Sequence, residues 1–177
     1  LNVENVYFSA RLSEERKRIA KKVRKNEKIL VMFSGCGVYP LVIAKNTEAK
    51  EIYGIEINPI AHKYALENLK LNKISNIKLF LGDAKKVLPK IREKFDRIIM
   101  PLPKGAENFL GLALNKIKKN GITHFYSFAE ENYYGNIKKI INDECEKKKK
   151  KCKIIDIVKC GQFSPRVYRV CVDFRVL

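Results

Sequence analysis

Residues 29–44 read ILVMFSGCGVYPLVIA, and this pattern is the strongest indication of the fold. An apolar run breaks at Ser34-Gly35-Cys36-Gly37 and then continues as an apolar pattern typical of a helix. Glycine tolerates positive φ and allows close backbone approach, so such a turn can press against a flat or charged ligand. The pattern therefore predicts a buried strand over 28–34, a glycine turn, and a helix over 39–46.

The rest of the chain repeats this alternation of strands and helices. Further strands are expected over 51–58, 77–83, 95–103 and 121–129, further helices over 13–24, 59–73, 106–118 and about 132–148, and a short helix or turn over 84–92. Asn120-Gly121 is expected to stop the helix that precedes it. Two strands, 153–164 and 167–177, close the chain and are joined by a short loop, which makes them antiparallel. The sequence thus predicts an α/β fold with a doubly wound, mainly parallel sheet and an antiparallel C-terminal strand pair.

Length and composition exclude several classes of protein. The 177 residues fit one ordinary domain, and the chain begins with Leu1, so we expect a piece of a longer protein. It contains no apolar run long enough for a membrane span and no signal peptide, so a cytoplasmic protein is expected. The five cysteines form no C-x-x-C pair, and His62 and His124 lie far apart, so neither a zinc site nor a disulfide framework is expected. No obligate protein partner is evident from the sequence.

The charge is strongly positive, with 37 Lys and Arg against 19 Asp and Glu and a net charge of +18. Such a charge is typical of proteins that bind a polyanion, most often nucleic acid. A background rich in lysine, isoleucine and asparagine would give the same charge without such a partner. The lysine run in CEKKKKKCK (145–153) is interpreted as a solvated face.

Distinctive residues follow four of the predicted strands at their carboxyl ends, where doubly wound sheets bind ligands. The Gly35–Gly37 turn follows the first strand, Glu56 ends the second, Asp83-Ala84 follows the third and Pro101-Leu102-Pro103 follows the fourth. A carboxylate such as that of Glu56 can accept both hydroxyls of a ribose, and Asp83 can accept an exocyclic amine such as adenine N6. Glu56 lies 19 residues after Gly37, close to the roughly 20 expected of a nucleotide-binding unit.

Two adenosine-containing ligands compete for this pattern, a dinucleotide and S-adenosylmethionine. A dinucleotide fingerprint requires a third glycine at the helix start, where this chain has Tyr39 and Pro40. S-adenosylmethionine carries no phosphate, so it needs no pyrophosphate cradle and fits the turn better.

Five stretches together resemble a known pair of sister families. They are VYFSARLSEERKRI (6–19), FSGCGVYPLVIA (33–44), YGIEINPIAHKYALENLKLNK (53–73), DRIIMPLP (96–103) and GITHFYSF (121–128). In combination they resemble the archaeal tRNA methyltransferases that modify N1 of the guanosine next to the anticodon. They are equally similar to the wybutosine-synthesising aminocarboxypropyltransferases. The resemblance spans nearly the whole chain and implies a Rossmann-like class I methyltransferase fold, with S-adenosylmethionine as group donor, no metal, and tRNA as partner.

Three departures favour the transferase sister. The methyltransferases carry Asn-Leu-Pro where this chain has Pro101-Leu102-Pro103, and proline supplies neither a side-chain amide nor an N–H. They also favour F-S-P-R where this chain has Ala10, and aspartate where this chain has Glu56. The expected function is therefore transfer of the 3-amino-3-carboxypropyl group to the tricyclic wyosine precursor of tRNA(Phe). Guanosine N1-methylation is the alternative, followed by a non-catalytic nucleic-acid-binding domain and a small-molecule methyltransferase.

The resemblance also assigns roles to residues. Ser9 and Arg16 would hold the methionyl arm, Glu56 would bind ribose, and Asp83 with the Ala84 backbone would bind adenine. The cofactor-binding set expected in full is Ser9, Arg16, Phe33, Gly35, Gly37, Glu56, Ile57, Asp83 and Ala84. Pro101, Leu102 and Pro103 would position the target base, and no catalytic residue is assigned. Arg11, Lys104 and Arg166 are candidate phosphate contacts. Residues 1–24 would form an entry segment and a basic helix that caps the cofactor site, and residues 25–177 the catalytic domain, with a tRNA-binding region expected before them.

Overall fold

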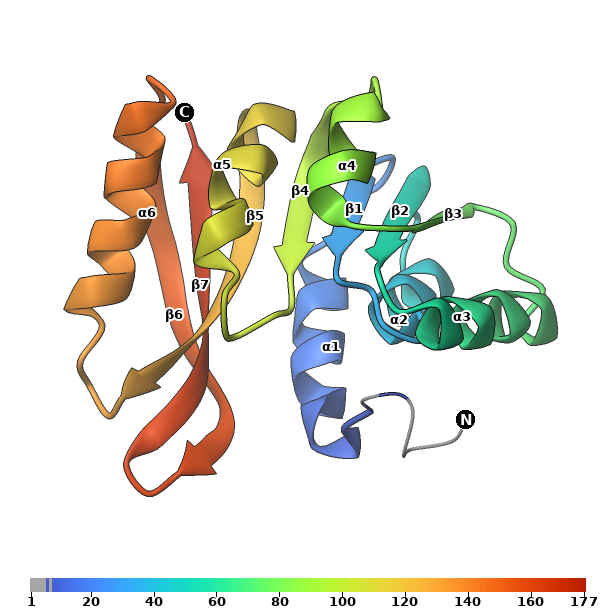
Figure 1. The fold of residues 1–177 in the computed structure, drawn as a ribbon, viewed down its shortest axis with the longest axis horizontal. Helices are drawn as coiled ribbons and strands as arrows, with labels where there is room; N and C mark the ends of the chain where they lie inside the picture. Colours follow the sequence, from blue (N-terminus) through green and yellow to red (C-terminus); the bar gives the residue numbers. More distant parts are fainter. Residues whose placement is uncertain (1–5, 7) are drawn as a thin grey trace. The chain divides into compact units, whose positions relative to one another are not determined.

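The chain divides into two units, residues 1–92 and residues 93–177. The structure is a computed structural model, and it describes residue 6 and residues 8–177. Figure 1 labels the helices and strands along the chain.

The first unit has the strand order β3-β2-β1, and its strands are parallel. Its elements are a 3₁₀ turn Ala10–Leu12, α1 Ser13–Lys21, β1 Lys28–Met32, α2 Val38–Asn46, β2 Glu51–Glu56, α3 Pro59–Leu71, β3 Ile77–Leu81, α4 Ala84–Val87 and a second 3₁₀ turn Leu88–Lys90. Asn58 starts α3 because its side chain accepts a hydrogen bond from Ile60 N at 2.9 Å, and Pro59 fits the first turn. Each strand and helix expected in this unit is present, with ends that differ by a few residues.

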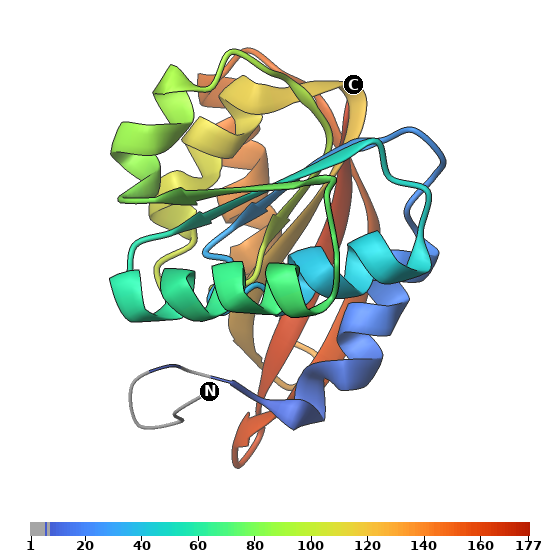
Figure 2. The same cartoon turned by 90° about the vertical axis from the view of Figure 1, so that its right-hand side faces the viewer.

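Helices lie on both faces of the three strands, as Figure 2 shows. Helices α1, α2 and α3 lie on one face, and α4 lies on the other. The apolar run 29–32 of β1 is fully buried. Burial on both faces explains why this strand is apolar at every position and not at every second one. The doubly wound arrangement is therefore present within this unit.

The second unit has the strand order β4-β5-β7-β6. Its elements are β4 Phe95–Met100, α5 Glu107–Lys116, β5 Ile117–Glu130, α6 Gly135–Lys147, β6 Cys152–Ser164 and β7 Val167–Val176. Strands β4 and β5 are parallel, whereas β7 pairs antiparallel with both β5 and β6. The predicted antiparallel C-terminal pair is confirmed. Helices α5 and α6 lie together on one face of these strands (Figure 1).

The helix stop expected at Asn120-Gly121 is wrong. Helix α5 already ends at Lys116, β5 begins at Ile117, and the Asn-Gly pair lies inside that strand. Asn120 has φ +61°, and the pairing partners of β4 jump from Ile117 to Ile122. Asparagine tolerates the left-handed region, so the pair forms a bulge in the strand instead of a helix cap.

The fourth strand also ends earlier than expected, at Met100. Proline at position 101 has no N–H to donate to a sheet, which explains why the strand stops there. All five cysteines are free thiols. Within the described residues, no helix combines the length and apolarity needed to cross a membrane.

Candidate functional site

The glycine turn after β1 is built by backbone hydrogen bonds to the neighbouring strand. Ser34 N donates to Ile55 O at 2.9 Å, and Gly37 N donates to Ser34 O at 3.0 Å. Gly35 has φ +56° and Gly37 has φ +81°. A Cβ on Gly37 would lie 3.1 Å from the Cβ of Ala65, whereas a Cβ on Gly35 would meet no atom within 4 Å. Gly37 thus lets α2 and α3 approach each other, while Gly35 faces open space.

Phe33, which precedes the turn, is held in an unusual backbone conformation. Its φ is +59°, in the left-handed region that bulky residues rarely adopt. A conformation of this kind costs about 1–3 kcal/mol and occurs most often at ligand sites. The strained residue therefore marks the same turn that the glycines mark.

The carboxylate of Glu56 joins the glycine turn to the end of β2. Its Oε2 accepts Gly35 N at 2.7 Å, and its Oε1 accepts Asn58 N at 2.8 Å. A carboxylate has about four acceptor positions, so two remain for a ligand after these bonds are made. The end of β3 joins the same place, because Gly82 N donates to Glu56 O at 2.8 Å. The structure thus brings the expected ends of β1, β2 and β3 together.

Asp83 and Ala84 follow directly as the start of α4. The Asp83 side chain caps this helix by accepting Lys85 N at 2.8 Å, which uses one of its acceptor positions. Ile57 beside Glu56 is 65% exposed, and Leu81, the register partner of Glu56, is 50% exposed. Exposed apolar side chains next to a carboxylate suit a ligand with a flat apolar face and polar edges.

Ser9 and Arg16 also lie together. Arg16 is buried, and its Nη1 donates to Ser9 O at 3.1 Å, while its guanidinium lies 5.6 Å from the ring centroid of Phe8. The pKa of the Cys36 thiol is raised by burial, while the charge of Arg16 lowers it and the charge of Glu56 raises it. Both charges therefore act on the glycine turn.

Asn68 is a residue of this site that the sequence analysis missed. Its Nδ2 donates to Cys36 O at 3.1 Å and so fixes the carbonyl of the glycine turn from α3. Helical spacing offered a signal, because Asn68 lies three residues after Ala65, which packs on Gly37. A polar residue on an inward face of a helix is a candidate for a backbone hydrogen bond.

These features fit the nucleoside part of S-adenosylmethionine. The open space at Gly35 admits a ligand against bare backbone, Glu56 retains acceptor positions for two hydroxyls, and no cluster of phosphate-binding donors is needed. Among the described residues, His124, Cys171 and Asp173 of the second unit form a group close enough to hold a metal ion.

That group is better explained as a buried polar bridge. His124 Nδ1 lies 2.6 Å from Asp173 Oδ1, and Arg97 Nη1 lies 2.7 Å from His124 Nε2. Arginine donates only, so Nε2 accepts and Nδ1 donates to the carboxylate. A guanidinium on the second ring nitrogen opposes a bound cation. His124 joins β4, β5 and β7 through hydrogen bonds.

Pro101, Leu102 and Pro103 follow β4 in the second unit. Leu102 N donates to Met100 O at 2.9 Å, and all three residues are half-buried. Of the candidate phosphate contacts, Arg11 belongs to the first unit, whereas Lys104 and Arg166 belong to the second, and all three are exposed. These assignments stay predictions.

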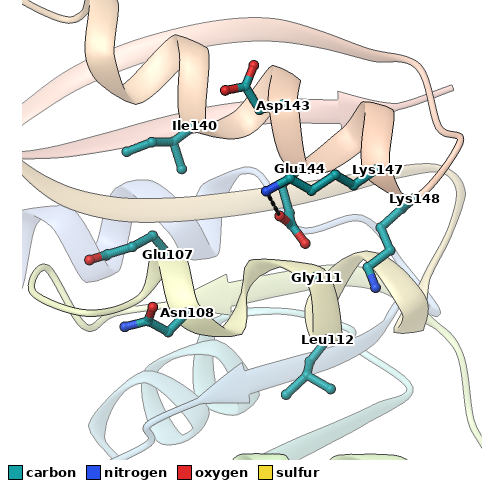
Figure 3. A pocket seen from close by; sticks show the side chains of 9 residues that line it. All are labelled: Glu107, Asn108, Gly111, Leu112, Ile140, Asp143, Glu144, Lys147 and Lys148. Atoms are coloured by element: carbon teal, nitrogen blue, oxygen red, sulfur yellow. Dashed lines mark hydrogen bonds and ion pairs between the residues drawn. The ribbon is translucent and has the colours of Figure 1, made fainter.

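A groove between α5 and α6 contains none of the expected site residues. It has a volume of about 520 Å³, and Figure 3 shows the Glu144–Lys147 ion pair of 3.3 Å on its α6 wall. A Cβ on Gly111 would lie 2.9 Å from Lys148 Cε, so this glycine lets the two helices come close. Both carboxylates and ammonium groups line the groove, namely those of Glu107, Asp143, Glu144, Lys147 and Lys148.

Comparison with known proteins agrees with this fold. Solved structures that share this α/β fold and its antiparallel C-terminal strand pair are class I S-adenosylmethionine-dependent transferases. The chain belongs to the TRM5/TYW2 methyltransferase domain family, whose model matches residues 1–155.

Two relatives represent the two sister activities. The tRNA (guanine(37)-N(1))-methyltransferase Trm5b of Pyrococcus abyssi is 38% identical over 99% of this chain and 52% of its own length. The tRNA(Phe) (4-demethylwyosine(37)-C(7)) aminocarboxypropyltransferase of Methanocaldococcus jannaschii is 32% identical over 98% of this chain and 69% of its own length. The chain spans about half the length of the methyltransferase relative.

Solved structures give the same picture. Trm5b from P. abyssi matches with a TM-score of 0.91 at 38% identity, over 99% of this chain and 52% of that one. M. jannaschii TYW2 in complex with AdoMet matches with a TM-score of 0.88 at 31% identity, over 99% and 80%. A complex of aTrm5 and tRNALeu matches with a TM-score of 0.82 at 32% identity, over 97% and 47%. The predicted fold class is confirmed, and the sister relationship expected from the sequence holds at the level of the family.

Proposed function

We propose that this chain is the S-adenosylmethionine-binding catalytic domain of an enzyme that modifies the tRNA nucleoside next to the anticodon. The observation that carries the proposal is the Glu56 carboxylate. It accepts hydrogen bonds from Gly35 N and Asn58 N and has further acceptor positions for a ligand. The AdoMet complex of the M. jannaschii relative and the tRNA complex of aTrm5 support the donor and the acceptor.

In this proposal each residue of the site binds one part of the donor. Glu56 accepts the two ribose hydroxyls, Asp83 accepts the adenine amine, and Ile57 packs against the adenine ring. Arg16 binds the carboxylate of the methionyl arm by a charge-assisted hydrogen bond, with Ser9 holding the guanidinium in place. Phe33 forms a wall of the pocket.

The domain layout proposed here assigns residues 1–24 to a segment that covers the cofactor site. Within it, α1 and the turn before it carry Arg16 and Ser9. Residues 1–5 and 7 of this segment lie outside the described residues. Residues 25–177 would form the catalytic domain, and the shorter span relative to the methyltransferase relatives supports a further tRNA-binding region in the whole protein.

The donor supplies a sulfonium, and a nucleophilic atom of the tRNA nucleobase can attack the carbons bonded to its sulfur. If the methyl carbon is attacked, its bond to sulfur breaks, the electron pair stays on sulfur, and S-adenosylhomocysteine leaves. If the γ-carbon of the methionyl arm is attacked, the aminocarboxypropyl group moves and methylthioadenosine leaves. The protein contributes positioning, so the pose of the arm at Arg16 decides between the two products.

Of these products, guanosine N1-methylation has the stronger support from relatives. The methyltransferase relative is 38% identical to this chain and the transferase relative is 32% identical. Aminocarboxypropyl transfer, which the sequence analysis favoured, remains the second candidate because Pro101 lacks the amide side chain typical of the methyltransferases.

The experiment uses S-adenosylmethionine labelled with ³H on the methyl group and ¹⁴C on the carboxyl group. The protein is incubated with tRNA that carries unmodified guanosine, and in parallel with tRNA that carries the wyosine precursor. Methyl label in the first tRNA establishes methylation, and carboxyl label in the second establishes aminocarboxypropyl transfer. Absence of both labels from both tRNAs contradicts the proposed function.

A further inference from the structure

The hairpin formed by β6 and β7 carries an exposed aromatic residue at its end. Phe163 is 66% exposed and stands next to the turn Pro165-Arg166, where Arg166 has φ +60°. Arg166 O accepts Glu131 N at 2.8 Å, so the turn is tied to the residue that follows β5. The exposed ring therefore sits on a supported hairpin end.

Phe163 is one member of a stack that we call the hairpin platform, defined as Phe128, Phe163 and Arg169. The two phenylalanine rings have centroids 4.2 Å apart at an angle of 34°, and Arg169 Cζ lies 5.9 Å from the Phe128 centroid. Phe128 and Arg169 are register partners across β5 and β7. The platform thus combines two aromatic faces with a guanidinium.

A glycine leaves the platform open on the side of β6. Gly161 is the register partner of Arg169, and a Cβ at Gly161 would meet no atom within 4 Å. Its φ of +146° favours glycine, so a side chain is absent there for a backbone reason. Aromatic rings at the end of a hairpin can also serve only to hold its strands together. The contact of the Phe163 ring with Phe128 serves that role, and it does not use the part of the ring that is exposed to solvent.

Charge selects the partner of this surface. Arg166 is exposed in the turn three residues after Phe163, Arg169 belongs to the platform, and Lys159 lies 4.7 Å from the ring of Tyr168 and pairs with Glu131 at 3.0 Å. Single-stranded nucleic acids are bound by aromatic side chains that stack on bases and by cations that contact the backbone. A net charge of +18 favours the same partner.

We propose that the hairpin platform is an RNA-contact surface, on which an unpaired base of the tRNA substrate stacks against Phe163 while Arg166 binds a neighbouring phosphate. This inference rests on the proposed function for the identity of the RNA. It adds a contact in the second unit to the donor site of the first unit.

The test uses the absence of tryptophan from the sequence. In the variant Phe163→Trp the indole is the single tryptophan, and a stacked base quenches its fluorescence. The matched control is Ile155→Trp, which places an indole at a 47% exposed position on the same strand, away from the hairpin end. Each variant is titrated with unmodified tRNA and with an oligouridylate, and circular dichroism checks its fold.

We expect saturable quenching of Phe163→Trp that weakens with added salt, and none of Ile155→Trp. Phe163→Ala should weaken tRNA binding, measured by gel shift, by about 10-fold, as expected for loss of one stacked base.

Two results overturn the proposal. In the first, the emission of Phe163→Trp stays unchanged while the gel shift records bound tRNA. In the second, the emission changes only with protein concentration, which indicates pairing of two copies. Calorimetry with S-adenosylhomocysteine separates the two proposals: donor binding without quenching overturns only the platform, whereas failure of donor binding contradicts the proposed function.

Discussion

Replacing Glu56 with glutamine tests the role of this carboxylate in both the fold and the donor site. The side chain keeps its size, but one oxygen becomes an NH₂ group that cannot accept a hydrogen bond. One of the two N–H groups now bound at 2.7 Å (Gly35) and 2.8 Å (Asn58) then loses its acceptor. An unsatisfied group of this kind costs about 1–3 kcal/mol, so we expect the free energy of unfolding to fall by about 1–2 kcal/mol.

The effect on donor binding should be larger than the effect on the fold. A ribose hydroxyl that donated to a charged carboxylate now meets a neutral amide, and hydrogen bonds to charged groups are worth about 1.5–3 kcal/mol. We therefore expect S-adenosylhomocysteine to bind Glu56→Gln about 10- to 100-fold more weakly, since 1.4 kcal/mol is a factor of ten. Isothermal titration calorimetry measures the affinity, and urea unfolding followed by circular dichroism measures the stability.

Glu51→Gln is the matched control, because it makes the same change at the other end of β2. Glu51 pairs there with Lys78 at 2.7 Å and Lys28 at 3.2 Å. Its loss should change stability slightly and leave donor affinity unchanged. If Glu56→Gln binds S-adenosylhomocysteine with wild-type affinity, the ribose-binding role of Glu56 is refuted.

Three further predictions concern other parts of the chain. Gly37→Ala should lower the free energy of unfolding more than Gly35→Ala does. Both residues have positive φ, but only a Cβ on Gly37 would press on Ala65, at 3.1 Å. The midpoints of urea unfolding compare the two variants, and equal midpoints would show that the contact is unimportant. His124→Phe should destabilise the protein by about 3–5 kcal/mol, because it removes the bridge between two buried charges; a loss below about 1 kcal/mol would mean that the bridge contributes little. Burial raises the pKa of the Cys145 thiol to about 12, so this thiol stays protonated at pH 8.5. Iodoacetamide followed by peptide mass spectrometry should label the partly exposed Cys152 and Cys160 before Cys145; early labelling of Cys145 would contradict its burial.

The meeting of the strand ends in the first unit could be predicted because its signals are local. Two glycines between an apolar strand and an apolar helix, an acidic residue at the end of the next strand and an Asp-Ala pair after the third all lie at strand ends. Parallel strands bring their carboxyl ends to one edge, so short-range patterns were enough to place Gly35, Glu56 and Asp83 together.

The polar bridge of the second unit could not be predicted in this way. His124 lies 27 residues from Arg97 and 49 residues from Asp173. Only the pairing of β5 with β4 and β7 brings these residues into contact, and each of them alone looks like an isolated polar residue in an apolar strand. The helix stop predicted at Asn120-Gly121 was wrong for a related reason. The same residue types cap helices and form bulges in strands, and only the pairing of the strands determines which of the two occurs.

We propose that the strand ends of the first unit bind the nucleoside of S-adenosylmethionine and no dinucleotide. Calorimetric titration of the wild-type chain with S-adenosylhomocysteine, and separately with NAD, tests it directly. We expect saturable binding of S-adenosylhomocysteine at one site per chain and no heat of binding with NAD. Binding of NAD in preference to S-adenosylhomocysteine, or binding of neither, would contradict it.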